Sequence, residues 1–202
     1  MPKTLYLMRH GETLFNTRHI IQGWCDSPLT PRGIEQAKLT RDHIEQTGIT
    51  FDHAYCSPAE RAAMTLEVVT REKLPYERMR GLREFCYGKL EGCSYDLFEA
   101  SPYGSPYECY GDFLVAYGGE TEEAVGERMA KTMTDIMERE GHQNVFVVSH
   151  GACIRRFTTL WDERNLIHVR AVTKNCSLAT FSYEDGAFTL VDLFEPDLSQ
   201  LD

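Results

Sequence analysis

Two histidines in this 202-residue sequence stand at the ends of strand-like segments, and each is followed by a glycine. His10 follows the run Leu5–Met8 and Arg9, and His150 follows the almost continuously apolar run Asn144–Ser149. Open α/β sheets bind ligands at the edge where the carboxyl ends of parallel strands meet. A glycine beside each imidazole lets the chain turn sharply and lets a ligand come close to the backbone. The two imidazoles are therefore expected to share one ligand site.

Two arginines are expected at the same edge of the sheet. Arg9 precedes His10, and Arg61 lies in the first turn of the helix that follows a predicted strand at 51–56. The planar guanidinium group matches the oxygens of a phosphate group, and the helix starts add backbone N–H donors. An imidazole can also attack phosphorus and carry the phosphoryl group covalently. The set indicates a site that binds phosphate and can transfer a phosphoryl group.

The elements that must position these residues alternate between strands and helices. Apolar runs predict strands at 4–8, 51–56, 144–149, 177–183 and 187–194. Helical periodicity and end signals predict helices at 12–19, 30–47, 57–70, 121–140 and 151–161, the third opened by a capping box of Ser57 and Glu60. This order predicts an α/β fold, in which a mostly parallel central sheet carries helices on both faces and an antiparallel edge.

The chain length favours a single domain over residues 1–202. Residues 85–118 interrupt the alternation, because they hold six tyrosines, two prolines and five glycines without clear periodicity. We interpret this segment as an insertion over the sheet and as a candidate lid.

The composition excludes several classes of partner. The net charge of −10 supplies no global field that would attract nucleic acid or an anionic membrane. No apolar run approaches the length of a membrane span, and no secretory segment opens the chain. Seven cysteines without a CxxC pair are typical of reduced thiols rather than of a zinc cluster. We expect a cytoplasmic protein, a monomer or homodimer, that uses no metal or cofactor.

Six sequence blocks resemble the histidine phosphatase superfamily, the phosphoglycerate-mutase-like proteins, over roughly residues 4–155. The blocks are, in chain order, Arg9–Thr13 with Asn16, Gln22–Gly33, Ser57–Ala62, Leu82–Phe85, Gly118–Thr121 and Ser149–Gly151. The tripeptide Arg-His-Gly alone would be a weak match. Six blocks in the family's order, each on the element that it needs, make the resemblance specific.

The resemblance implies a role for each matching residue. His10 corresponds to the nucleophile that becomes phosphohistidine, and Glu84 corresponds to the proton donor. The residues that surround the phosphate would be Arg9, Arg61 and His150. Further substrate contacts would come from Asn16, Gln22 and Gly23. The adjacent Arg83 is expected to face solvent or to serve packing.

Three functions remain open at this stage. The family's mutases carry a longer insertion with paired basic residues, whereas residues 85–127 hold one basic residue, Lys89, against nine acids. We therefore favour a metal-independent phosphomonoesterase that releases inorganic phosphate from a small phosphorylated metabolite. The alternative is a cofactor-dependent phosphoglycerate mutase. A non-catalytic phosphate-binding module is the third, although the complete set of chemical groups argues against it. If the acidic, tyrosine-rich segment faces the site, neutral leaving groups should be preferred.

Overall fold

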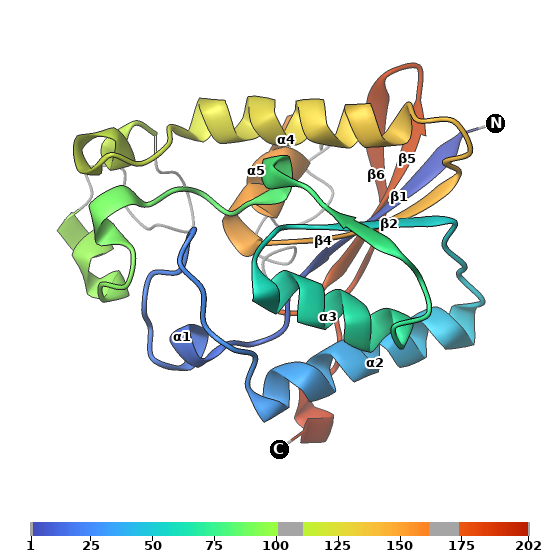
Figure 1. Ribbon diagram of the computed structural model, residues 1–202, viewed down its shortest axis with the longest axis horizontal. Coiled ribbons are helices and arrows are strands. Elements are labelled where there is room, and N and C mark those ends of the chain that lie inside the picture. The colour runs from blue at the N-terminus through green and yellow to red at the C-terminus, as the bar shows by residue number, and fades with distance from the viewer. Residues whose placement is uncertain (1, 101–110, 162–173, 202) are drawn as a thin grey trace.

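The computed structural model describes residues 2–100, 111–161 and 174–201. Within these ranges a six-stranded sheet has the order β3-β2-β4-β1-β5-β6 (Figure 1). Its strands are β1 (Lys3–Arg9), β2 (His53–Cys56), β3 (Tyr76–Arg78), β4 (Asn144–Ser149), β5 (Leu178–Glu184) and β6 (Ala187–Phe194). The first four are parallel to one another, and β5 and β6 form an antiparallel edge beside β1. The predicted fold class is confirmed.

Helices cover both faces of this sheet (Figure 1). On one face lie α2 (Pro31–Thr47) and α3 (Glu60–Thr70), and on the other lie α4 (Glu122–Met137) and α5 (Gly151–Trp161). The short α1 (Leu14–Thr17) follows β1. None of the helices in the described part of the chain is long and apolar enough to cross a membrane.

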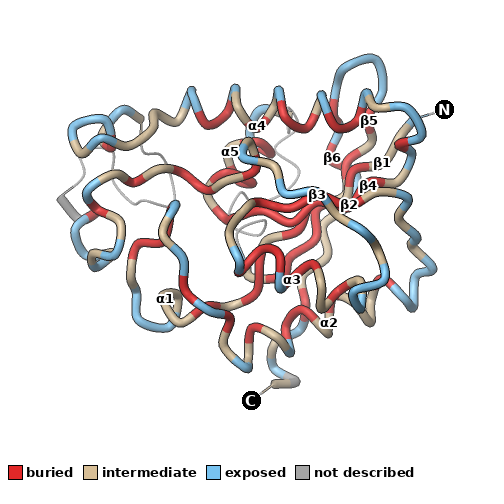
Figure 2. The backbone as a smooth tube through the Cα atoms, in the orientation of Figure 1, coloured by how far each residue is buried: buried red, intermediate tan, exposed pale blue. Residues whose placement is uncertain are grey.

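The apolar run of β4 is explained by its place between two hydrophobic clusters. Val145 and Val147 belong to the cluster on the α4 and α5 side, and Phe146 and Val148 belong to the cluster on the α2 and α3 side. All four side chains are fully buried, and the tube in Figure 2 shows the central strands as buried. A strand that is covered on both faces has no polar alternation.

The register of β1 and β4 brings the two histidines together. The strands pair in parallel with Arg9 opposite Ser149, so the residues that follow them leave the sheet at the same level. The His10 amide donates to the carbonyl of Ser149 over 3.1 Å. The sheet itself therefore places His10 and His150 side by side at its carboxyl edge.

Most element boundaries match the prediction, and the start of α3 does not. The predicted capping box is wrong, because α3 begins at Glu60 and its N-cap residue, Ala59, makes no side-chain hydrogen bond to the helix. The Ser57 hydroxyl accepts from the Ala59 amide at 3.3 Å, and the Glu60 amide donates to the Asp26 carboxylate at 2.6 Å. A carboxylate from a distant loop thus takes the donor that the local capping box would have used.

Other differences concern short or terminal segments. The predicted helix at 12–19 is confined to α1, which Thr13 caps through the amide of Asn16. Helix α4 ends at Met137, three residues before the predicted end. Strand β3 was not predicted, because it has only three residues and two of them are exposed.

The described parts of the candidate lid pack against the core. Residues 85–100 and 111–118 contain the short 3₁₀ helices 88–90, 95–100 and 113–117, and Tyr87, Phe98 and Leu114 are buried in the cluster that also holds α4 and α5 side chains. Residues 101–110, in the middle of the segment, lie outside the described residues. Closure over the site therefore stays a prediction.

The turn after His10 packs directly on helix α2, and this contact requires glycine. A Cβ added at Gly33 would lie 2.1 Å from the carbonyl oxygen of Glu12. We expect Gly33→Ala to lower the free energy of unfolding by about 1–3 kcal/mol, because two backbone segments would have to separate. Chemical denaturation measures this change.

Gly126→Ala in α4 is the matched control. There the nearest atom to an added Cβ is Nε of the flexible Arg156 side chain, at 3.0 Å. Alanine in a helix interior is more favourable than glycine by up to about 1 kcal/mol, so this variant should be neutral or stabilised. Equal destabilisation of the two variants would contradict the proposed backbone contact.

Candidate active site

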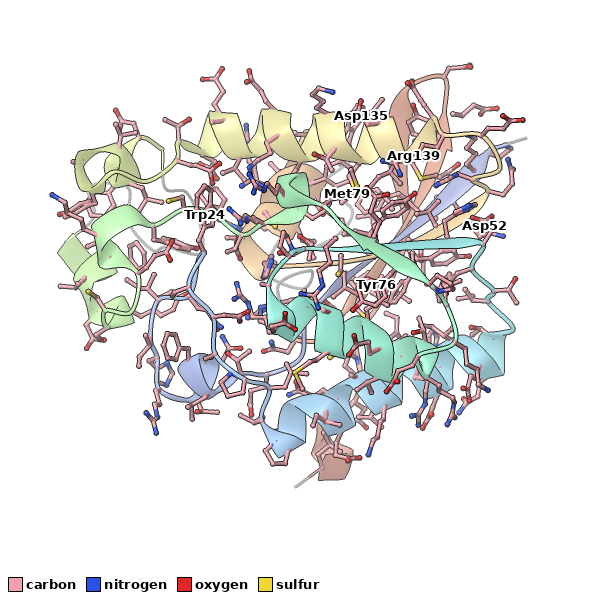
Figure 3. All side chains as sticks on the ribbon, in the orientation of Figure 1. Trp24, Asp52, Tyr76, Met79, Asp135 and Arg139 are labelled. Carbon is pink, nitrogen blue, oxygen red and sulfur yellow. The ribbon has the colours of Figure 1, made fainter. Side chains whose placement is uncertain are left out.

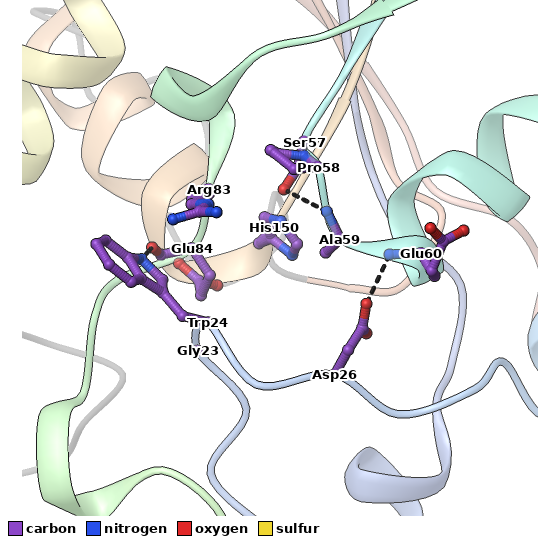
Figure 4. Close-up of a pocket in the computed structure, with 10 residues that line it drawn as sticks. All are labelled: Gly23, Trp24, Asp26, Ser57, Pro58, Ala59, Glu60, Arg83, Glu84 and His150. Carbon is purple, nitrogen blue, oxygen red and sulfur yellow. Dashed lines mark hydrogen bonds between the residues drawn. The ribbon is translucent and has the colours of Figure 1, made fainter.

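A cavity of about 160 Å³ opens at the carboxyl edge of the sheet (Figure 4). It is lined by Gly23, Trp24, Asp26, Ser57, Pro58, Ala59, Glu60, Arg83, Glu84 and His150. Three of these, Gly23, Glu84 and His150, are among the residues that the sequence assigned to the site. Figure 3 shows Trp24 beyond the carboxyl end of the sheet, far from Asp52, which directly precedes β2.

The imidazoles of His10 and His150 lie next to each other at the carboxyl edge of the sheet. His10 is 4% exposed and His150 is fully buried. Their ring centroids are 5.2 Å apart, and the ring planes meet at 63°. At this separation a single phosphoryl group could contact both rings.

The hydrogen-bond partners assign opposite tautomers to these rings. His10 Nδ1 lies 2.7 Å from the carbonyl oxygen of Gly11, which can only accept, so Nδ1 carries the proton and Nε2 keeps its lone pair. His150 Nδ1 instead accepts from Arg61 Nε at 3.2 Å, so its proton is on Nε2. That buried Nε2 has no acceptor among the described residues. One ring therefore offers a nucleophile and the other offers a donor.

Both imidazoles are also held in the neutral form. Burial, together with the positive charges of Arg61 and Arg9, lowers the pKa of His10 well below its ordinary value. Burial and the same arginines lower the pKa of His150 in the same direction. An unprotonated His10 at neutral pH is the form that can attack phosphorus.

Arg61 is almost completely buried, with 1% of its surface exposed. Besides its bond to His150, its Nη1 donates to the carbonyl of Cys25 at 2.9 Å and pairs with Asp26 at 2.8 Å. Its Nη2 donates to the carbonyl of Gly23 at 2.8 Å. Arg61 thus orients the imidazole of His150 and holds the loop 23–26 at the cavity.

Arg9 approaches the site from the end of β1. Its guanidinium packs against Gly151, where an added Cβ would lie 3.2 Å from Cζ and Nε of Arg9. Its charge lowers the pKa values of His10 and His150. The predicted pair of arginines is therefore present beside the two imidazoles.

The carboxylate of Glu84 is buried in the wall of the cavity, with 5% of the residue exposed. Its Oε1 accepts from the amides of Phe85 and Cys153, and its Oε2 accepts from the amide of Ala152, all at 2.9 Å. Two of these donors lie in the first turn of α5, directly after His150. The backbone bonds fix the orientation of this carboxyl group in the cavity wall.

Arg128 of α4 holds the backbone on which Glu84 stands. Its guanidinium donates to the carbonyls of Gly81 and Arg83 at 2.8 Å, and to that of Glu84 at 3.3 Å. Glu120 balances its charge in an ion pair of 3.0 Å. The sequence did not indicate Arg128, because an arginine on a helix face is usually solvated.

Asn16 and Gln22 support the loops around the site. The Asn16 amide oxygen accepts from the Thr13 amide at 3.1 Å. The Gln22 side-chain amide lies 2.7 Å from the Thr13 hydroxyl and 3.1 Å from the Ser27 hydroxyl. Neither residue lines the cavity, whereas Gly23 does. Direct contact of these two amides with a substrate stays a prediction.

Sequence reasoning missed other supporting residues. Asn175 Nδ2 donates to the carbonyl of His10 at 3.0 Å. Glu91 accepts from the amides of Trp24 and Cys25, at 2.9 and 2.6 Å, and so fixes the loop whose carbonyls hold Arg61. Asp26, which pairs with Arg61, was also missed. Its place inside the block Gln22–Gly33 was the one sequence signal that could have indicated it. The contacts of Glu91 run to backbone amides far away in the chain, and no spacing predicts them.

Comparison with known proteins decides the family. Residues 5–196 match the family model of the histidine phosphatase superfamily (branch 1). The chain belongs to this superfamily.

Among the described residues, no group of three histidine, cysteine or acidic side chains is placed to hold a metal ion.

Relatives of this histidine phosphatase include both phosphatases and mutases. A broad-specificity phosphatase of Saccharomyces cerevisiae is 29% identical over 192 residues, which cover 89% of this chain and 79% of the yeast protein. The crystal structure of a phosphoglycerate mutase from Bacillus anthracis superposes with a TM-score of 0.81 at 29% identity, covering 98% of this chain and 94% of that one. A phosphoserine phosphatase of Entamoeba histolytica, solved in complex with 3-phosphoglyceric acid, gives 0.76 at 25% identity, covering 96% and 98%.

The buried histidines of this histidine phosphatase make its stability depend on pH. In the unfolded chain a histidine binds a proton below about pH 6.5, whereas folded His10 and His150 resist protonation. The unfolded state therefore gains protons first, and the free energy of unfolding should fall as pH drops from 7 to 5. Each of the two histidines can contribute at most about 1.4 kcal/mol per pH unit to this fall in the free energy of unfolding.

Replacing His10 by glutamine should flatten this dependence, because one group that titrates only in the unfolded state is removed. Urea denaturation of both proteins at several pH values measures the two slopes. If His10→Gln lowers the free energy of unfolding by the same amount at every pH, that loss reflects packing and does not change the slope with pH. Parallel curves for the two proteins would show that folded His10 takes up its proton normally.

Proposed function

We propose that this histidine phosphatase is a metal-independent phosphomonoesterase that hydrolyses a small phosphorylated metabolite through a phosphohistidine at His10. The hydrogen bonds that assign opposite tautomers to the two rings carry this proposal. The lone pair on His10 Nε2 can attack phosphorus, while the Nε2–H of His150 can donate to a phosphoryl oxygen. A site that only bound phosphate would gain nothing from a nucleophile in this form.

In the first step, His10 Nε2 forms a bond to phosphorus and the bond between phosphorus and the ester oxygen breaks. The ring becomes positively charged, and the carbonyl of Gly11 stabilises the proton on Nδ1. Arg9, Arg61 and His150 offset the charge on the equatorial oxygens. In the substrate complex Glu84 carries a proton taken up from solvent, and it donates this proton to the leaving alkoxide.

In the second step, Glu84 is the base. Its carboxylate removes a proton from a water molecule, whose oxygen attacks the phosphorus. The bond to His10 Nε2 breaks, and its electron pair returns to the ring. Inorganic phosphate leaves, and each group regains its starting protonation state. Because arginines and an imidazole offset the charge, no step requires a divalent ion.

The size of the cavity supports a small substrate. Its volume of about 160 Å³ is below the usual range for pockets that hold drug-sized ligands. It suits a phosphoryl group with a leaving group of a few atoms. The complex of the Entamoeba histolytica relative with 3-phosphoglyceric acid is consistent with a substrate of this size.

A cofactor-dependent phosphoglycerate mutase is the second candidate, and the likeness to the mutase from Bacillus anthracis favours it. A mutase must keep the phosphoryl group on His10 until an acceptor alcohol arrives. Incubation of 3-phosphoglycerate with a 2,3-bisphosphoglycerate primer distinguishes the two functions. Formation of 2-phosphoglycerate faster than inorganic phosphate would favour the mutase.

A phosphoenzyme on His10 is the direct prediction of this mechanism. Rapid quenching with a ³²P-labelled ester in the presence of EDTA should trap a label that is stable to base and labile to acid. His10→Ala should lose both the label and turnover. Turnover by His10→Ala close to that of the wild type would overturn the assignment of the nucleophile.

The acid role of Glu84 predicts a dependence on the leaving group. Glu84→Gln removes the proton that an alkoxide needs, which typically costs about 10²–10⁴-fold in rate. An activated nitrophenolate leaves with little help, so hydrolysis of p-nitrophenyl phosphate should fall much less than that of an alkyl phosphate. Equal losses for the two esters would show that another group supplies the proton.

A further inference from the structure

Arg83, which was expected to face solvent or to serve packing, lies in the wall of the cavity. It lines the cavity together with the neighbouring Glu84, and its guanidinium stacks over the indole of Trp24, with 4.7 Å from Cζ to the ring centroid. Figure 4 shows Arg83, Trp24 and Glu84 on one side of the cavity, and Asp26 and Glu60 on the other. The positive charge therefore stands on the side that carries the proton donor of the proposed reaction.

The indole under Arg83 is a fixed platform. Trp24 is 49% exposed, which is unusual for so large an aromatic side chain. Its Nε1 nevertheless donates to the carbonyl of Glu84 at 3.0 Å, and its backbone amide donates to Glu91 at 2.9 Å. Stacking on a tryptophan face stabilises a guanidinium group. Both partners are thus held at the mouth of the cavity.

Among the described residues that line the cavity, Arg83 carries a positive charge that no carboxylate balances. Asp26 pairs with Arg61 at 2.8 Å, and Glu60 pairs with Arg78 at 2.6 Å. No carboxylate in the described part of the chain lies within ion-pair distance of Arg83. Its N–H donors remain available to a ligand that reaches past the phosphate position.

We propose that Arg83 is a specificity-determining residue that binds an anionic group, best a carboxylate, on the leaving group of the substrate. This rests on the proposed phosphomonoesterase function. It reverses the preference for neutral leaving groups that the acidic segment suggested. None of the described residues at 85–100 and 111–118 lines the cavity, so their acidic side chains do not form its wall.

A carboxylate fits this position better than a second phosphoryl group. The planar fork of a guanidinium pairs with the two oxygens of a carboxylate in one plane. The cavity is small, so the phosphoryl group that reacts would repel a second phosphoryl dianion more strongly than it repels a carboxylate monoanion. The favoured ester therefore carries a carboxylate a few bonds from the ester oxygen.

The test uses two probes that differ in this group alone. In 3-phosphoglycerate a carboxylate stands where glycerol 3-phosphate has a hydroxymethyl group. Arg83→Gln should lower kcat/KM for 3-phosphoglycerate by roughly 10- to 100-fold, as expected for a lost charge-assisted hydrogen bond, and change that for glycerol 3-phosphate less than threefold. Arg83→Lys should restore part of the loss. A bisphosphate probe, glycerol 1,3-bisphosphate, tests the second-phosphate alternative.

Arg80→Gln is the matched control, because Arg80 is exposed on the same segment and does not line the cavity. It makes the same change in net charge and should affect neither probe. Binding of both probes to His10→Ala, with and without Arg83→Gln, is measured by calorimetry and does not depend on turnover. If Arg83→Gln weakens the binding of 3-phosphoglycerate alone while the wild-type protein hydrolyses neither probe, that result would support the Arg83 site and overturn the proposed function. If Arg83→Gln lowers kcat/KM equally for 3-phosphoglycerate and glycerol 3-phosphate, or for neither, the proposed role of Arg83 is wrong. A larger loss of kcat/KM for glycerol 1,3-bisphosphate than for 3-phosphoglycerate would also overturn it.

Discussion

The buried charge of Arg61 is the constraint on which the rest of the site depends. A guanidinium with 1% of its surface exposed must have its donors satisfied, because an unpaired buried charge costs several kcal/mol. The partners come from two parts of the chain: the loop 23–26, through the Asp26 carboxylate and the carbonyls of Gly23 and Cys25, and Nδ1 of His150. One side chain therefore closes the loop onto the start of α3 and sets the tautomer of the second imidazole.

The sheet supplies the other half of the arrangement. Pairing of Arg9 with Ser149 across β1 and β4 brings His10 to the level of His150, and the apolar cover on both faces makes that register costly to shift. Asn175 then holds the carbonyl of His10 from the start of the antiparallel edge. The proposed nucleophile, His10, thus follows a strand that is paired on both sides, whereas Arg83, which is proposed to select the substrate, and Trp24 stand on loops at the mouth of the cavity.

Much of this could be predicted from the sequence, because local signals carry it. Thr30, Pro31 and Gly48 marked both ends of α2, and the run of β4 marked a strand that is covered on both faces. The predictions failed where a distant group competes with a local one. Asp26 displaced the expected capping box at α3, and the stacking of Arg83 on Trp24 joins residues 59 positions apart. Such contacts arise from the packing of loops, and periodicity and capping rules do not predict them because these rules use only neighbouring residues in the sequence.

The protonation of the two imidazoles tests the central claim most directly. Long-range ¹H–¹⁵N correlation spectra of the ligand-free protein near pH 7.5 distinguish the two neutral tautomers and the imidazolium, and His10→Gln and His150→Gln assign the signals. The account predicts a proton on Nδ1 of His10 and a proton on Nε2 of His150. The same tautomer on both rings, or an imidazolium at either, would contradict it.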